Sequence, residues 1–237
     1  AGIPTEGILE GGDIAKMWLA DSGNVSPSSY SSAHPFKPEN MYDGDLRTHW
    51  TSQSWDDGNW ARNKQVFASF KEPVDISSVI WVPRLDGSYA SNLRLYTVTV
   101  WRQGDDLKGP GTLVSPDPLR GGSASDHNTW LNVGNNPGVT KFAVLPFEPT
   151  TDVVQVAITI EQMDYSAVSL SELMFMEYDP AHSLPDNIAA LFASELRTQL
   201  KTGVAQADID ALKARLNSDE INYYLNPETL RASMSAW

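Results

Sequence analysis

The sequence predicts a mainly β protein, an antiparallel β-sandwich that is followed by a small α-helical segment. From about residue 64 to residue 178, short apolar or alternating runs are separated by loops rich in Gly, Pro, Asp and Asn, which is typical of a sandwich. After residue 178 the period of the apolar residues changes from two to about 3.6, which indicates helices. We therefore expect the sandwich at residues 25–179, an N-terminal extension at residues 1–24, and a linker or the start of a further domain at residues 180–237.

Five runs carry the strand prediction. In each of them Val, Ile, Phe, Trp or Thr alternates with polar residues or forms a continuous apolar stretch, as in half-buried and buried strands. Short strands joined by long loops favour a sandwich. The five runs are residues 65–70, 79–82, 96–101, 141–145 and 153–160.

Three helices are expected in the C-terminal segment. The first begins near Ser183, which resembles the start of a capping box with Asp186, and Gly203 is placed to end it. Its apolar side chains fall on one face: Ile188, Leu191, Phe192, Leu196 and Leu200. The second helix carries Ile209, Leu212 and Leu216 on one face, and Asn226-Pro227 is typical of the start of a third.

Composition excludes several functional classes. The net charge of −13 and the lack of a Lys/Arg cluster argue against a nucleic-acid partner. With no cysteine there are no disulfides or thiolate metal sites, and the four histidines form no metallopeptidase motif, so we expect no enzyme in this chain. No apolar run approaches the length of about 18 residues that a membrane helix needs. If the protein is exported, its signal has been removed.

Residues 41–50 place acidic oxygens, a turn and a hydroxyl close together. Asp43, Asp45 and Thr48 supply the oxygens and Gly44 supplies the turn, a pattern that suits calcium because calcium binds carboxylates, hydroxyls and backbone carbonyls. The alternative is a surface Asp-Gly turn whose aspartates cap their own backbone. The ten residues alone leave both interpretations open.

Three motifs in order make the chain resemble the coagulation factor 5/8 type C (discoidin-like) domains, and among them the family-32 carbohydrate-binding modules. The first motif is Asp43-Gly44-Asp45 with Thr48 and Trp50. The second is residues 82–87, Val-Pro-Arg-Leu-Asp-Gly, followed by Asn92 and residues 95–100. The third is Ser171-Glu172-Leu173 at the start of the last strand. The resemblance covers about residues 25–178 and implies a galactose-binding-like, jelly-roll β-sandwich.

The resemblance also implies a structural calcium site. Its side-chain ligands would be Asp43, Thr48 and Glu172, and its backbone ligands would be the carbonyls of Asn40, Asp45, Thr48 and Ser171. Oxygen donors without nitrogen or sulfur suit calcium better than zinc. Such an ion would stabilise the fold and take no part in chemistry.

A sugar site in the loops at one end of the sandwich is implied as well. Arg84 and Asn92 match the family's polar ligands, and the aromatic candidates for stacking on a pyranose are Trp55, Tyr89 and Tyr165. Many relatives that bind galactose or N-acetylgalactosamine have a histidine where this chain has Thr51, so the choice of sugar stays open. Trp50, Trp81 and Trp101 are expected in the core.

The helical segment has a resemblance of its own. Residues 184–216 look like the helical lead-in to the catalytic domain of enhancin-like (M60-type) zinc metallopeptidases, which attack mucin-type glycoproteins. Together the two resemblances imply a secreted, periplasmic or cell-surface bacterial protein in which a non-catalytic module targets a downstream catalytic domain to a glycan. The alternative is a protein-protein interaction or scaffold domain of a secreted multidomain protein.

Overall fold

The computed structural model describes residues 3–21, 38–51, 64–84, 93–115, 129–132, 141–163 and 168–237. The chain divides into two compact units, residues 1–177 and 178–237, close to the boundary expected at residue 179. Each unit is described by itself.

The first unit is built from one antiparallel sheet. Its main path runs in the order β2, β8, β3, β7, β4 and β5, while β1 pairs with β3 and β6 pairs with β7. The predicted antiparallel β-sandwich is confirmed. The strands are β1 (Ile14–Asp21), β2 (Trp50–Thr51), β3 (Lys64–Pro83), β4 (Leu93–Arg102), β5 (Thr112–Leu113), β6 (Thr129–Asn132), β7 (Lys141–Met163) and β8 (Ser169–Glu177).

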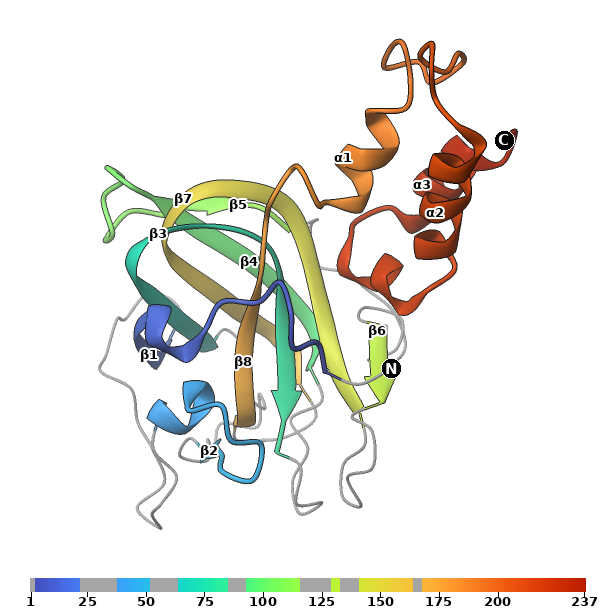
Figure 1. Ribbon diagram of the computed structural model, residues 1–237. Helices are drawn as coiled ribbons and strands as arrows, with labels where there is room; N and C mark the ends of the chain where they lie inside the picture. The colour runs from blue at the N-terminus through green and yellow to red at the C-terminus, as the bar shows by residue number, and fades with distance from the viewer. Residues whose placement is uncertain are drawn as a thin grey trace. The chain divides into compact units, whose positions relative to one another are not determined.

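Two long strands, β3 and β7, let a single sheet form both layers of the sandwich. The first part of β3 pairs with β1, its last part pairs with β8, and β7 accompanies β3 on both sides of an irregular stretch. The register shifts lie between Ser69 and Ser78, and both strands curve strongly in Figure 1. Bends and bulges of this kind take a strand from one layer of a sandwich to the other.

The main core lies between the two layers, and it holds Trp50 and Trp81 without any exposure. A smaller cluster lies on the outer face of the sheet, because Phe67 and Trp101 alternate along their strands with core residues. Phe67 stacks on Trp18 with ring centroids 5.0 Å apart and lies 5.9 Å from Trp101. All three tryptophans predicted for the core are therefore buried, although Trp101 belongs to the outer cluster.

The N-terminal residues are part of the sandwich, so their description as an extension is wrong. Strand β1 pairs with β3 over its whole length. Ahead of it, the backbone N–H of Leu9 donates to the carbonyl of Phe175 and that of Glu177 donates to the carbonyl of Gly7, at 2.9 and 2.8 Å. This short segment lies along β8 and is followed by the 3₁₀ turn η1 (Gly11–Asp13). Apolar residues of β1 drive this pairing because they reach the core.

The second unit is a small helical bundle with its own apolar core. Its elements are α1 (Leu184–Ala189), α2 (Gln206–Leu216), the 3₁₀ turn η4 (Asp219–Tyr223) and α3 (Pro227–Met234). The second and third helices form where the sequence predicts them, and Ile209, Leu212 and Leu216 are buried.

The first helix is shorter than the apolar pattern predicts. It ends at Ala189, and the chain then forms a small loop in which Phe192 and Leu200 form an isolated antiparallel β-bridge. Arg197 has a φ of 54°, a left-handed conformation that a continuous helix does not allow, and Leu196 is 81% exposed. The hydroxyl of Ser183 makes no cap bond, so the predicted capping box is absent. Within the described part of the chain, no helix is both long and apolar enough to span a bilayer.

Candidate functional site

The loop that leads into β2 is folded around its own oxygen atoms. It begins within the 3₁₀ turn η2 (Pro38–Tyr42) and reverses at Gly44, whose φ of 75° favours glycine. The hydroxyl of Thr48 donates to Asp43 Oδ2 at 2.5 Å and contacts the carbonyl oxygen of Asp45 at 2.9 Å. Three residues expected from the sequence to supply oxygen ligands, Asp43, Asp45 and Thr48, therefore lie together. We call residues 40–48 the cation loop.

Glu172 joins the cation loop from the last strand. Its Oε1 accepts a hydrogen bond from the backbone N–H of Gly44 at 2.9 Å, across 128 residues of sequence. Glu172 is only 4% exposed and pairs with Val82 in the ladder between β8 and β3. Burial, followed by the contact with Asp43, raises the pKa of Glu172 to about 9, while the hydrogen bond from the Gly44 N–H acts in the opposite direction. The charges of Asp43 and Asp45 both act in the same direction as burial.

The donor set fits a hard cation. Two carboxyl groups, Asp43 and Glu172, face each other, and a divalent ion would relieve both their repulsion and the cost of burying Glu172. Ser171, whose carbonyl is an expected ligand, is buried beside Glu172. No group of three or more His, Cys, Asp or Glu side chains gathers among the residues that the structure describes. The remaining ligands would have to be hydroxyl and carbonyl oxygens, which is what calcium accepts.

Two residues of the cation loop use their side chains elsewhere. The carboxylate of Asp45 pairs with the exposed Arg47 at 3.0 Å, so only the carbonyl of Asp45 is directed to the cluster around Thr48. The amide Nδ2 of Asn40 donates to the carbonyl of His49 at 2.9 Å, which ties η2 to the residue before β2. Sequence reasoning assigned Asn40 only a backbone role, and no sequence signal indicates this side-chain bond.

A second group of expected site residues meets at one edge of the sheet, where β2, β8 and β3 lie side by side. Thr51 pairs with Ser169, and the backbone N–H of Arg84 donates to the carbonyl of Ser169 at 3.1 Å. Thr51 and Arg84 therefore flank Ser169 on its two sides. We call these three residues the recognition edge. The other sugar-site residues, Asn92, Trp55, Tyr89 and Tyr165, lie outside the described residues, and the description of Thr51 is limited to its backbone.

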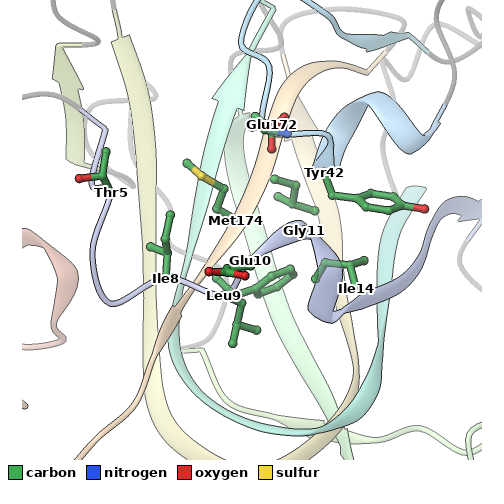
Figure 2. Close-up of a pocket in the computed structure, with 12 residues that line it drawn as sticks. Thr5, Ile8, Leu9, Glu10, Gly11, Ile14, Tyr42, Glu172 and Met174 are labelled. Atoms are coloured by element: carbon green, nitrogen blue, oxygen red, sulfur yellow. Dashed lines mark hydrogen bonds between the residues drawn. The ribbon is translucent and has the colours of Figure 1, made fainter.

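A pocket of about 300 Å³ lies between the N-terminal segment and β8. Figure 2 shows Glu172 and Tyr42 on one side of it and Ile8 and Leu9 on the other. The backbone closes tightly here, since a Cβ at Gly11 would lie 2.3 Å from the carbonyl oxygen of Tyr42. Sequence reasoning missed this pocket because it depends on the N-terminal residues lying along β8. Its importance for the site is that it borders the carboxyl group of Glu172.

No protein-family model matches the sequence, and no curated protein does. Solved structures do match. The pair of family-32 carbohydrate-binding modules (CBM32-1 and CBM32-2) of ZmpB from Clostridium perfringens is 15% identical over 96% of this chain and 49% of that one, with a TM-score of 0.55. The same pair in complex with GalNAc is 16% identical over 97% of this chain and 51% of that one, with a TM-score of 0.55.

A module of a family 31 glycoside hydrolase from Clostridium perfringens, CBM32-3, matches at 15% identity and a TM-score of 0.51. That match covers 73% of this chain and 97% of the module. The chain spans about half the length of the ZmpB module pair that it matches. At these identities the likeness concerns the fold. The first unit of this chain thus has the discoidin-like β-sandwich fold of the family-32 carbohydrate-binding modules.

Proposed function

We propose that this chain is a non-catalytic carbohydrate-binding module that targets an attached bacterial enzyme to glycans. The observation that carries the proposal is the recognition edge, which brings Arg84 and Thr51 to the two sides of Ser169 in a fold shared with such modules. The planar guanidinium of Arg84 can donate to two neighbouring hydroxyls of a sugar ring. The net charge of −13 favours a neutral glycan over an anionic one.

The matched structure that holds GalNAc supports a proposal for the sugar class. We propose a galactose- or N-acetylgalactosamine-type sugar, on its own or in a mucin glycoprotein. The attached enzyme would be a glycosidase or a mucin-directed metallopeptidase, in a secreted, periplasmic or cell-surface protein. A single sugar in a shallow site binds with a Kd of about 0.1–1 mM, and tethering to an enzyme makes such an affinity useful.

Arg84→Gln is expected to weaken glycan binding about 10- to 100-fold, because hydrogen bonds from a charged donor contribute about 1.5–3 kcal/mol. A glycan array followed by calorimetric titration of the best glycan measures the loss. Arg102→Gln is the matched control, since Arg102 donates to Thr151 rather than to the recognition edge. Equal affinity in Arg84→Gln and wild type would contradict the proposed site. Capture of a protein partner that free sugars do not displace would instead support the interaction-domain alternative.

We propose calcium as the structural cofactor of the cation loop. Asp43, Thr48 and Glu172 would hold it by their side chains, and Asn40, Asp45, Thr48 and Ser171 would hold it by their carbonyls. When bound, the ion would supply positive charge between the carboxyl groups of Asp43 and Glu172, which face each other. The chain itself positions the ligand side chains. The Gly44 N–H donates a hydrogen bond to Glu172, and the Thr48 hydroxyl donates one to Asp43.

Removing calcium is expected to lower the melting temperature by about 5–10 °C. Calcium at 100 times its Kd stabilises the folded state by about 2.7 kcal/mol, and each kcal/mol shifts the melting temperature of a domain of this size by about 2–4 °C. Differential scanning calorimetry with EDTA, and then with calcium or magnesium added back, measures the effect. A melting temperature that does not respond to calcium after chelation would contradict the cation site.

A further inference from the structure

The cation loop and the recognition edge share two stretches of backbone. On β8, Glu172 lies three residues from Ser169, and along the loop Thr48 lies three residues from Thr51. Strand β2 is only two residues long, and its ladder with β8 consists of two pairs, Trp50 with Leu170 and Thr51 with Ser169. A ladder this short holds its strand weakly, because few hydrogen bonds offset the entropy of ordering the backbone. The position of Thr51 therefore depends on the packing of Trp50 in the core and on how the loop before β2 is held.

One side-chain hydrogen bond joins the loop to β2 directly. Asn40 is half-buried, and its Nδ2 donates at 2.9 Å to the carbonyl of His49, the residue that precedes β2. Its neighbour Met41 is fully buried in the main core, so η2 offers the amide from a fixed position. The bond spans nine residues and closes the loop at its two ends. Binding that orders η2 and the cation loop would therefore also restrain the start of β2.

We propose that Asn40 is a positioning residue that couples cation binding in the loop to sugar binding at the recognition edge. This inference rests on the proposed function. The backbone carbonyl of Asn40 is a proposed ligand of the cation, while its side chain holds His49 and, through it, the register of Thr51 beside Ser169. Coupling of this kind is reciprocal: calcium raises the affinity for the sugar, and the sugar raises the affinity for calcium by the same factor.

Amide hydrogen exchange tests the link without any sugar. In the wild-type chain, calcium is expected to slow exchange at residues 49–51 by about fivefold or more, the lower end of typical coupling factors. In Asn40→Ala, and in Asn40→Leu, which has a similar shape but no N–H donor and no charge, this slowing is expected to disappear. Calcium titration of both variants separates a change in cation affinity from a loss of coupling, because both keep the backbone carbonyl of Asn40 and add no charge. Glu39→Gln, an exposed change on the same turn, is the control.

Titration with N-acetylgalactosamine adds a readout that a purely structural role would not change. The ratio of sugar affinity with calcium to that without it is expected to be about five or more in wild type and Glu39→Gln, and close to one in both Asn40 variants. Equal protection of residues 49–51 by calcium in wild type and variants would overturn the inference. A loss of calcium affinity as large as the loss of coupling would overturn it too. If wild type binds no glycan, the proposed function fails, and the exchange data alone decide whether Asn40 links the loop to β2.

Discussion

Glu172→Gln is expected to stabilise the protein without calcium and to abolish its stabilisation by calcium. In the metal-free protein Glu172 must hold a proton, because burial and the contact with Asp43 raise its pKa to about 9. At pH 7 that protonation costs up to about 3 kcal/mol, at 1.36 kcal/mol for each pH unit above the usual value of a glutamate. A neutral amide of the same shape avoids the cost and keeps an oxygen for the N–H of Gly44, but it loses the charge that attracts the ion.

The pH dependence has a definite sign. The pKa of Glu172 rises from about 4.5 when unfolded to about 9 when folded, so the folded state binds more protons between these values. The free energy of unfolding of the metal-free protein therefore falls as pH rises from about 4.5 to about 9. Calcium takes the place of that proton, so its Kd should fall by about tenfold for each unit of rising pH within this range.

Urea unfolding of wild type and Glu172→Gln in EDTA and in calcium, at pH 6 and pH 8, measures these effects. Glu148→Gln is the control for the Glu-to-Gln substitution itself, since Glu148 is exposed and its backbone N–H bonds to Val114 rather than to the cation loop. The expected pattern is an opposite order of stability in the two conditions: the variant is more stable than wild type in EDTA and gains nothing from calcium. A variant that is less stable than wild type in EDTA would show that Glu172 is held as a charged, stabilising carboxylate.

Trp50→Ala is expected to lower the free energy of unfolding by about 3–5 kcal/mol, the usual cost of removing a fully buried tryptophan. Trp50 has no exposed surface, and it is the residue through which β2 enters the main core. Since β2 has only two residues, loss of this ring should also release Thr51 from Ser169. We expect calcium and glycan binding to weaken in parallel. Urea denaturation, followed by both titrations under conditions where the variant is folded, measures this.

Trp18→Ala is the comparison for Trp50→Ala. Trp18 is half-buried and stacks on Phe67 outside the main core, so a loss of roughly 1–3 kcal/mol is expected, with no effect on either ligand. If Trp50→Ala cost no more than Trp18→Ala, the packing of β2 on the core would not be what positions the recognition edge.

The sequence predicted the sandwich and the stretches that form it, but it could not show how the stretches connect. Residues 65–70 and 79–82 are parts of one strand, β3, and residues 141–145 and 153–160 are parts of β7. Pro73 and Pro146 suggest turns locally, yet both lie within strands where the ladder is irregular. Continuity through a bend is decided by pairing with neighbouring strands, which a local pattern does not contain.

The candidate site, too, could be predicted only in part from the sequence. Motifs with characteristic residues, such as Asp43-Gly44-Asp45 and Ser171-Glu172, could be recognised, and the structure brings Asp43, Thr48 and Glu172 together. The side-chain bond of Asn40 could not be predicted, because an amide in a turn has many possible acceptors. The prediction that the first helix continues beyond α1 was wrong although its apolar pattern is real. Leu191 and Phe192 are buried as a helical face requires, but the backbone after them turns back instead of continuing the helix.

The hydrogen bond between Gly44 and Glu172 has a consequence for the order of folding. Its partners are 128 residues apart, and β8 is the last strand of the sandwich to leave the ribosome. The cation loop is synthesised early but remains without its buried carboxylate until β8 docks, so the proposed calcium site would be completed only after the sheet has formed. Closure of so long a loop is slow, as in other folds with high contact order. Calcium should therefore act after chain synthesis, as a latch that lengthens the lifetime of the finished sandwich.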